Sequence, residues 1–479
     1  MTDNITERLA NRVTKIKYED LPEEVVSSIK WILLDSIGCA LGAAQTDKAR
    51  IALELMKELG GKPQASVIGG PPTSYAQAAF ANAELINALD YDYLGPLVGH
   101  VLPYVAPPCL AVAERQDSSG KDLLLALAVG MEVGGRMGSA LVQASMPKAD
   151  PPYYEESSRY SHSHSFFGGV AGAGMLLGFD SEKMQNAFGV AGMSAPVPAG
   201  MKWSHMAGPA IMLKYGAWTG WISQLAIVAA LVTEKGFTGD RTVLDGKWGY
   251  WQMIASPFFK TDTLLKGLGE VWHVSRGSFK LYPCCGANHA GIDGITRLMQ
   301  EHGIKPADID EILVKGESWL QTPNRMGDEL DSPLDVQFSN KFIFGLAPYA
   351  GLTPGPEWGD ANVYDRPEVR AMAKKVKIDL HPKTDEIIAE NIKAGRKPGF
   401  RKAIVELRAK GRTFITEIEA PKGEPGNPLT ESDLLVKFRH NATFSSLEQN
   451  RVDGIIDATL SLEKLDKVRK LANLWSIES

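Results

Sequence analysis

The chain has few cysteines and little net charge, and its most apolar predicted helix is too short to cross a membrane. Its 479 residues include four cysteines and carry a formal net charge of −6. A small negative net charge gives no indication of the basic surface that nucleic-acid binding requires. The most apolar predicted helix, residues 217–232, is shorter than the roughly 20 residues that a membrane span requires, and we expect it to be a core helix. We therefore expect neither nucleic acid nor a membrane as a partner.

The cysteines do not indicate a disulfide framework. Cys39 and Cys109 lie in apolar runs, where a thiol behaves as a small buried hydrophobe. Cys284 and Cys285 are neighbours in the sequence, which is a poor start for a structural disulfide. Together with a polar amino terminus and no secretory signal peptide, this usage predicts a cytoplasmic protein.

Apolar residues, by contrast, are plentiful and follow helical spacing in the first half of the chain. They make up 44% of a chain longer than a single core usually supports, so we expect about two domains. Val25, Ile29, Ile32 and Ile37 share one helical face, and glycines from Gly168 onward form a small-residue ridge. Further helices are predicted over residues 75–89, 121–137, 168–177, 181–189 and 209–232.

After about residue 267 the pattern becomes mixed. Short alternating runs predict strands at residues 312–314 and 376–380, and a hairpin joins residues 403–407 to 413–418 through a turn at Lys410-Gly411. Helical periodicity returns at the end of the chain, where one helical face is predicted to run from Leu462 to Trp475. The predicted fold class is mainly α: a large all-helical domain with an inserted smaller α+β lid domain. The predicted boundaries are residues 1–268 and 426–479 for the helical domain and 269–425 for the lid, with a site in the cleft between them.

Chemically active side chains are densest between residues 278 and 289. This segment holds Lys280, Tyr282, Cys284, Cys285 and His289. The preferred interpretation is that Lys280 binds a carboxylate with Tyr282 beside it. A metal site lacks a fourth ligand at the usual spacing, and a nucleophilic cysteine lacks an evident base. A Schiff-base role for Lys280 stays open.

A second cluster contains Asp90 and His100, at the two ends of one loop after a predicted helix. A carboxylate that bonds an imidazole fixes the tautomer of the ring, and such a pair can move a proton. The alternative is a helix-capping Asp and an ordinary core His.

Two further clusters precede predicted helices. His162 and His164 stand before the glycine-rich helix, where one of them can face an anionic substrate; a zinc pair or a polar surface turn are the alternatives. Lys202 and His205 precede an apolar helix, where the lysine either binds a carboxylate or extends along the surface without a role.

Several stretches of the sequence together resemble one known family. In order and spacing, over about residues 20 to 350, the chain is similar to the MmgE/PrpD family, which includes 2-methylcitrate dehydratase, cis-aconitate decarboxylase and iminodisuccinate epimerase. The stretches are Leu34-Asp35-Ser36-Ile37-Gly38, Ala88-Leu89-Asp90-Tyr91-Asp92, Ser119-Gly120-Lys121-Asp122-Leu123-Leu124, Glu132-Val133-Gly134-Gly135-Arg136, Met201-Lys202, Phe279-Lys280-Leu281-Tyr282-Pro283-Cys284-Cys285 and Gln337-Phe338-Ser339.

The resemblance implies a homodimer whose cleft performs cofactor-free and metal-free chemistry on a di- or tricarboxylate. The family's catalytic roles fall on Asp90, His100, Lys202 and Lys280, and its central histidine falls on His162 or His164. Further residues near these motifs are expected to contact the substrate: Tyr93, His205, Tyr282, Cys285 and His289.

The expected reaction is dehydration of a hydroxylated polycarboxylate similar to 2-methylcitrate, by proton abstraction next to a carboxylate. An isomerase, epimerase or decarboxylase could use the same proton transfer; a binding protein without catalysis and a zinc hydrolase on His162 and His164 are the other hypotheses. The chain departs from the family pattern at Leu94, where a threonine is common, and at Val101, where a proline is common. Residues 147–160 also form an expanded loop, so we expect a bulkier or less polar substrate.

Overall fold

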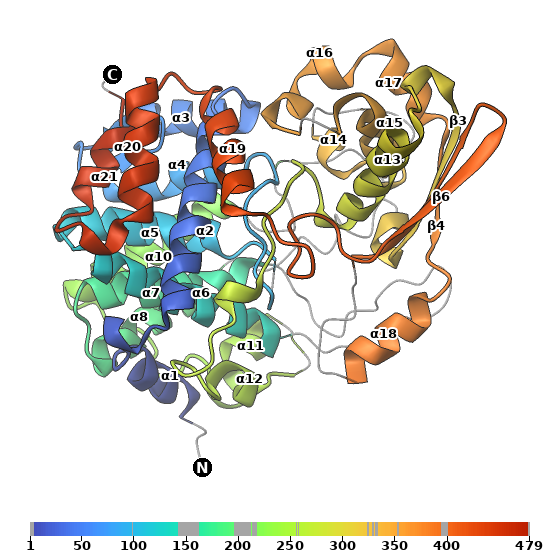
Figure 1. Cartoon of the computed structure of the whole chain (residues 1–479). Helices are drawn as coiled ribbons and strands as arrows, with labels where there is room; N and C mark the ends of the chain where they lie inside the picture. The colour runs from blue at the N-terminus through green and yellow to red at the C-terminus, as the bar shows by residue number, and fades with distance from the viewer. Residues whose placement is uncertain are drawn as a thin grey trace.

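The computed structural model describes residues 4–97, 99–141, 162–195, 212, 218–254, 256, 258–322, 325–327, 330, 334–351, 354–393 and 401–477. Figure 1 shows two parts side by side: a larger helical body, and a smaller part that carries a sheet with helices against it. The last helices of the chain return to the helical body, where they lie beside helices from its beginning.

The helical body has one continuous hydrophobic core that joins residues from both ends of the chain. Its helices are α1 (Ile5–Val13), α2 (Glu23–Gly42), α3 (Asp47–Leu59), α4 (Tyr75–Asn87), α5 (Leu102–Arg115), α6 (Gly120–Ala140), α7 (Phe166–Leu176), α8 (Ser181–Met193), α10 (Thr219–Glu234), α11 (Tyr250–Met253), α12 (Thr261–Leu265), α19 (Glu431–Ala442), α20 (Gln449–Leu460) and α21 (Arg469–Trp475). A short antiparallel hairpin, β1 (Ala65–Val67) with β2 (Gly70–Thr73), lies among them.

The glycine ridge lets α7 pack closely against α5, α6 and α10. A Cβ at Gly168 would lie 2.1 Å from the Gly130 carbonyl oxygen, and one at Gly172 would lie 2.4 Å from Cys109 Sγ. Contacts this short could be relieved only by moving α7 away from its neighbours, so both positions require glycine. The predicted close packing of this helix is thereby explained.

Replacing Gly168 with alanine should therefore destabilise the protein by about 3 kcal/mol, because the added methyl forces α7 away from α6. Urea unfolding followed by circular dichroism measures this change. The control is Gly359→Ala, where a Cβ meets nothing within 4 Å and the unfolding free energy should stay within about 0.5 kcal/mol of the parent. Equal stability of the Gly168 variant and the parent would contradict the proposed packing.

Two helices, α2 and α6, are long and apolar enough to cross a membrane by length and composition. Within the structure, 72% of the apolar window of α2 and 89% of that of α6 are buried inside the protein. Core helices pass the same length and composition test. Sequence analysis singled out residues 217–232 instead, a stretch that overlaps the shorter helix α10.

The smaller part is built on a four-stranded sheet in the order β4-β3-β5-β6. The strands are β3 (Ile309–Gly316), β4 (Val376–Leu380), β5 (Ala403–Ala409) and β6 (Arg412–Ile418); β3 and β4 are parallel, and the other pairs are antiparallel. The β5–β6 turn places Lys410 and Gly411 in the left-handed region, as the predicted Lys-Gly turn requires.

Helices cover this sheet and complete a second hydrophobic core, separate from that of the helical body. Helix α13 packs on β3, β5 and β6 and also contacts α15. The helices of the smaller part are α13 (His289–His302), α14 (Asp335–Phe338), α15 (Asn340–Ala350), α16 (Ala361–Tyr364), α17 (Pro367–Ala373) and α18 (Thr384–Lys393), of which α18 lies apart from the others in Figure 1.

The predicted mainly α fold class is confirmed. Residue-level boundaries and the movement of the smaller part as a lid stay predictions. Sequence analysis missed the β1–β2 hairpin and helix α5, whose internal Pro107 and Pro108 mask its periodicity. It also predicted one helical face from Leu462 to Trp475. The chain is interrupted there, because the Leu465 carbonyl accepts from Gly120 N and Val468 N donates to Ser118.

Candidate active site

A buried turn after α4 creates the centre of the candidate site. The chain leaves the helix and turns at Asp90, whose φ of 52° is left-handed, a conformation that aspartate tolerates better than most residues. The turn directs Asp90 and Asp92 towards His100, which precedes α5. All three side chains are at most 2% exposed.

His100 lies between the two carboxylates. Its Nε2 is 3.0 Å from Asp90 Oδ1, and its Nδ1 is 2.8 Å from Asp92 Oδ2. Asn87 Nδ2 donates to the other oxygen of Asp92 at 3.2 Å. The Asp90–His100 pairing that the sequence predicts is therefore present, and Asp92 is a second partner that it did not identify.

Two carboxylates around one imidazole favour its charged form. Burial by itself lowers the pKa of His100, but the negative charge of Asp92 and the hydrogen bonds that the ring donates to Asp90 and Asp92 outweigh it, so the pKa is raised above 6.5. An imidazolium donates through both nitrogens, which is what two carboxylate acceptors require. His100 is thus suited to donate a proton.

Lys280 reaches the same carboxylate from the segment that leads into the smaller part. Its Nζ is 3.0 Å from Asp90 Oδ1 and donates to the Asp90 carbonyl oxygen at 2.6 Å. Leu94 and Ser278 exchange two backbone hydrogen bonds of 2.9 Å, which hold the two segments together. Sequence analysis predicts Lys280 as a substrate clamp, whereas here its amine is buried and bound to Asp90.

A further ion pair completes the buried charges. Lys437 on α19 lies 2.7 Å from Asp35 on α2. Burial raises the pKa of Asp35, and Lys437 opposes that rise. With His100 protonated, the six groups sum to zero charge, which lowers the cost of burying them together. The carboxylates are Asp35, Asp90 and Asp92, and the cations are His100, Lys280 and Lys437.

His164 has the opposite character from His100. It lies in the 3₁₀-helix η2 (His162–Ser165), and burial lowers its pKa to about 3, so it is neutral at pH 7. A Cβ on Gly134 would be 2.9 Å from Val101 Cγ1 and 3.5 Å from the Ser165 carbonyl oxygen. Val101 and Ser165, which directly follow His100 and His164, therefore both lie against α6 at Gly134.

Three predicted site residues fall wholly or partly outside the described residues. The backbone of His162 begins η2, but its side chain is not among those described. Lys202 and His205 lie outside the described residues altogether, as does the predicted loop of residues 147–160. The predicted pairing of Lys202 with Lys280 across the cleft therefore stays a prediction.

The hydroxyls of two tyrosines predicted to contact substrate are bonded within the protein, and their contact with substrate stays a prediction. Tyr93 OH donates to the Val274 carbonyl at 2.5 Å, and its ring packs on Phe279. Tyr282 OH donates to Asp293 Oδ1 at 2.7 Å inside the second core. Both hydroxyls anchor the fold, because buried hydroxyls need partners and these are satisfied by protein.

Cys285 and His289 lie beside Lys280 at the start of α13. Burial opposes ionisation of Cys285, but the positive charge of Arg325, among other nearby charges, leaves the pKa of the thiol below its usual value. His289 Nε2 is buried with no hydrogen-bond partner among the described residues. Burial, with Lys280 and Arg401 nearby, lowers the pKa of His289 to about 3. Both residues keep their predicted role as substrate contacts.

Replacing His289 with leucine should make the protein less sensitive to acid. The pKa of His289 is about 3 in the folded chain against an ordinary 6.5, so between these values the unfolded chain binds the proton and stability falls as the pH is lowered. From about pH 7 to about pH 4, the variant should lose about 3 kcal/mol less unfolding free energy than the parent. Urea titrations at both pH values measure the difference.

The matched control for this prediction is His302→Leu, at the exposed end of the same helix. Its stability should follow the parent's pH dependence. A His289 variant as acid-sensitive as the parent would show that this ring is not held neutral.

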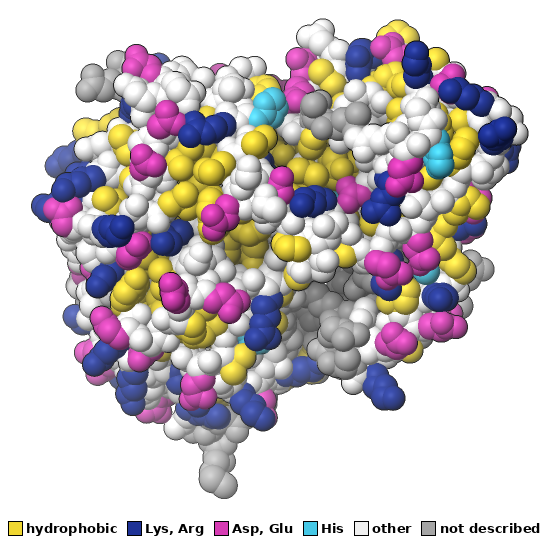
Figure 2. All heavy atoms as spheres, in the orientation of Figure 1, with side chains coloured by type: hydrophobic (Ala, Val, Ile, Leu, Met, Phe, Trp, Pro, Cys, Tyr) yellow, Lys and Arg dark blue, Asp and Glu magenta, His cyan; other side chains and the backbone are white. Residues whose placement is uncertain are grey.

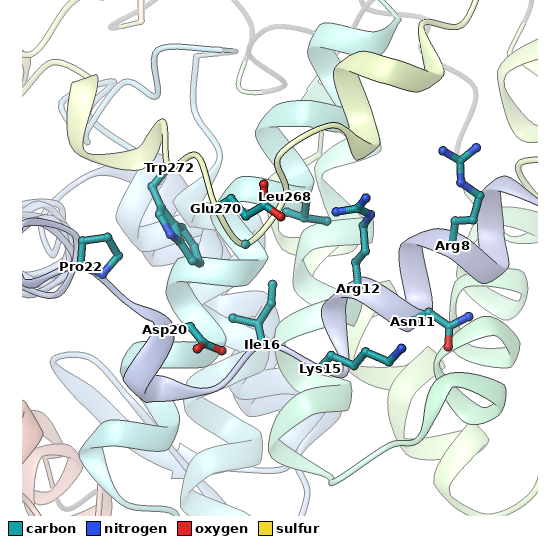
Figure 3. Close-up of a pocket in the computed structure, with 11 residues that line it drawn as sticks. Arg8, Asn11, Arg12, Lys15, Ile16, Asp20, Pro22, Leu268, Glu270 and Trp272 are labelled. Carbon is teal, nitrogen blue, oxygen red and sulfur yellow. The ribbon is translucent and has the colours of Figure 1, made fainter.

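A surface pocket of about 750 Å³ lies elsewhere on the helical body. Figure 3 shows it between α1, which contributes Arg8 and Arg12, the turn after α1 with Lys15, and a facing segment with Glu270 and Trp272. It shares no residue with the buried network. Charges of both signs line it, as they are interspersed over the face shown in Figure 2, and we assign it no role.

Within the described ranges, no group of three or more His, Cys, Asp or Glu side chains is arranged to hold a metal ion. The carboxylates nearest His100 are taken up by ion pairs with His100 and Lys280.

Comparison with known proteins decides the family. The MmgE/PrpD N-terminal domain matches residues 7–261, and the MmgE/PrpD C-terminal domain matches residues 282–462. The chain belongs to the MmgE/PrpD family. This confirms the resemblance drawn from the motifs, and the two matches together span both hydrophobic cores.

Similar curated proteins align over nearly the whole chain. The cis-aconitate decarboxylase-like protein oryM of Aspergillus oryzae is 27% identical over 99% of this chain and 98% of its own length. The cis-aconitate decarboxylases of Aspergillus terreus and Homo sapiens are 25% and 27% identical, over 98% and 99% of this chain and 95% of their own lengths. At the level of the family, the chain is thus placed with lyases of the decarboxylase or dehydratase type.

Sequence analysis missed Asp92 and Lys437. Asp92 has a sequence signal, because it stands two residues from Asp90 in the Asp-Tyr-Asp motif of a short loop. Lys437 has none, since it lies on a helix that sequence analysis did not predict and more than 150 residues from Lys280.

Proposed function

We propose that the protein is a cofactor-independent lyase that acts on a di- or tricarboxylate by proton transfer next to a carboxylate. The observation that carries this proposal is the buried chain Lys280–Asp90–His100–Asp92, with contacts of 3.0, 3.0 and 2.8 Å. Such a chain holds a protonated imidazole in a water-poor setting, where charge acts strongly on a bound anion.

His100 is proposed as the acid of the reaction. Its carboxylate partners raise its pKa and so favour its protonated form; Asp92 fixes the ring through Nδ1, and Nε2 bears the proton to be transferred. For transfer, a substrate group must take the place of Asp90 at Nε2. A substrate carboxylate has the charge to do so, and Lys280 would then be shared between it and Asp90.

His164 is proposed as the complementary base. Its lowered pKa leaves it neutral at pH 7, and two titratable groups whose pKa values are driven apart suit paired acid and base roles. Lys202 stays a proposed second cation for the substrate. The side chain of Leu94, whose Cδ1 would lie 3.1 Å from a Cβ on Gly286, adds an apolar wall near this region.

Decarboxylation of cis-aconitate is the first reaction to test, because relatives with that name align over nearly the whole chain. In it the bond to the leaving carboxylate breaks, carbon dioxide departs, and an acid protonates the resulting carbanion. Dehydration of 2-methylcitrate is the second candidate. It needs a base and an acid, and the opposite pKa shifts of His164 and His100 favour such a pair.

The test is a panel of polycarboxylates incubated with the purified protein. Carbon dioxide release from cis-aconitate, or alkene absorbance from 2-methylcitrate or citrate, would establish the class and name the reaction. Deuterium uptake from heavy water without either product would indicate the isomerase or epimerase alternative. No turnover and no exchange across the panel would refute the proposal.

A further inference from the structure

Lys437 makes an unusual set of contacts for a buried lysine. Its side chain is 3% exposed, and its Nζ meets Asp35 Oδ1 at 2.7 Å, the Tyr91 carbonyl at 2.9 Å and the Lys280 carbonyl at 2.9 Å. The two carbonyls accept hydrogen bonds from the ammonium group, and Asp35 forms an ion pair with it. The face of the Tyr91 ring lies 3.8 Å away and adds a cation–π contact.

The three oxygens come from three separate segments of the chain. Asp35 belongs to α2, Tyr91 to the turn after α4, and Lys280 to the segment that leads into the smaller part. Tyr91 is the residue after Asp90. Lys437 therefore joins the backbones of the two segments whose side chains form the Asp90–Lys280 ion pair.

Other contacts hold Lys437 itself in place. Its helix, α19, packs on α2, where a Cβ on Gly38 would be 2.9 Å from Phe438 Cδ2. Tyr91 OH donates to the Leu281 carbonyl at 3.0 Å and joins the same two segments a second time. These contacts hold the side chain of Lys437 in one position.

We propose that Lys437 is a positioning residue, which sets the distance between Asp90 and Lys280 and thereby the contact of Asp90 with His100. The proposal rests on the proposed function for its catalytic consequence, but its structural part can be tested without a substrate. The family motifs seen in the sequence do not include this residue.

A charge-neutral double variant separates position from electrostatics. The double variant Lys437→Met, Asp35→Asn replaces one buried cation and one buried carboxylate with neutral side chains of similar size. The sum of the buried charges is therefore unchanged. Any change at His100 then reports movement of its partners. The charged and titratable groups around His100 and Lys437 are Asp90, Asp92, Lys280, Asp35, Cys39, Tyr91 and Tyr104.

The first readout is the titration of His100, followed by NMR of protein labelled with carbon-13 at the histidine Cε1. The chain has nine histidines, and the signal of His100 is the one missing from a His100→Gln sample. If Asp90 moves away, His100 loses one carboxylate, and its pKa should fall by about one unit or more. A titration identical to that of the parent would overturn the proposal.

The second readout is steady-state kinetics with the substrate found in the panel. A shift of the acid by a fraction of an ångström should lower kcat about 100-fold and leave KM within about threefold. The matched control is Lys467→Met with Asp117→Asn, an exposed pair 3.2 Å apart, which should change neither readout. Turnover of the buried double variant within about threefold of the parent would overturn the catalytic consequence.

Lys437→Arg keeps the test decisive if the double variant does not fold. The guanidinium keeps the charge and the bond to Asp35, but its planar fork cannot direct donors at all three oxygens. The His100 pKa should fall in the same direction, with kcat about tenfold lower. An arginine variant equal to the parent in both readouts would refute the positioning role. If the parent turns over nothing in the panel, the proposed function fails, while the NMR titration still decides on Lys437.

Discussion

Replacing His100 with glutamine should lower kcat about 1000-fold and change KM little, because the variant has no proton to give. Glutamine keeps a side-chain N–H donor and so preserves part of the contact with the carboxylates. The chemistry is then lost without removing every contact that the His100 side chain makes with Asp90 and Asp92. Turnover of the substrate found in the panel measures the effect.

The pH profile distinguishes this role from a structural one. The folded pKa of His100 is raised above 6.5. A reaction that needs its proton should therefore slow as the pH rises through this folded pKa. This fall in rate at high pH, the basic limb of the profile, should be absent from the glutamine variant. The interactions that raise the pKa also stabilise the fold below pH 6.5, and that contribution is lost as the pH rises through the folded value.

His440 provides a matched control for His100. It also pairs with a carboxylate, Glu357, at 2.9 Å, but its side chain is 41% exposed. His440→Gln should keep the parent's turnover and pH profile. A His100 variant with at least a tenth of the parent's kcat would contradict a role as the reacting acid.

Replacing Asp90 with asparagine should lower kcat about 100-fold and destabilise the protein by about 3 kcal/mol. Asparagine suits the left-handed φ of 52° at this position, so the turn itself is preserved. What is lost is the negative charge that both Lys280 Nζ and His100 Nε2 contact at 3.0 Å. Two buried cations then share a neutral amide.

The same variant should move the basic limb of the pH profile to lower pH. Without the carboxylate of Asp90, the protonated form of His100 loses a stabilising partner while Lys280 still disfavours it, so the pKa of His100 falls. Chemical denaturation and pH–rate measurements test both parts. If kcat, stability and the basic limb all matched the parent, the ion-pair chain would have no role in the site.

The control for Asp90 is Asp453→Asn, which breaks the exposed ion pair between Arg439 and Asp453. Exposed pairs are screened by water, so its stability should change by less than about 1 kcal/mol and its turnover should not change. A comparable loss in both variants would show that the effect of Asp90→Asn comes from a general loss of charge.

Much of the architecture could be predicted from local pattern. The Lys410-Gly411 turn, strand β4 and the glycine ridge of α7 each depend on residues close in sequence, and the structure has them as predicted. The break between Leu462 and Trp475 could not be predicted in this way, because it is caused by hydrogen bonds to residues 118–120. The hydroxyl partners of Tyr93 and Tyr282 were likewise not predicted: Tyr93 bonds Val274, far away in the sequence, and Tyr282 bonds Asp293 on the helix that follows it.

The sequence by itself determined the mainly α fold class, the family and the residue types of the site, because periodicity and motif order are properties of neighbouring residues. It also placed Asp90 and His100 on one short loop, which suffices to pair them. The tertiary structure alone decided that His100 has two carboxylate partners, that Lys280 is bound to Asp90, and that Lys437 holds both segments. These contacts join segments far apart in the chain, and protonation depends on which charges meet out of water.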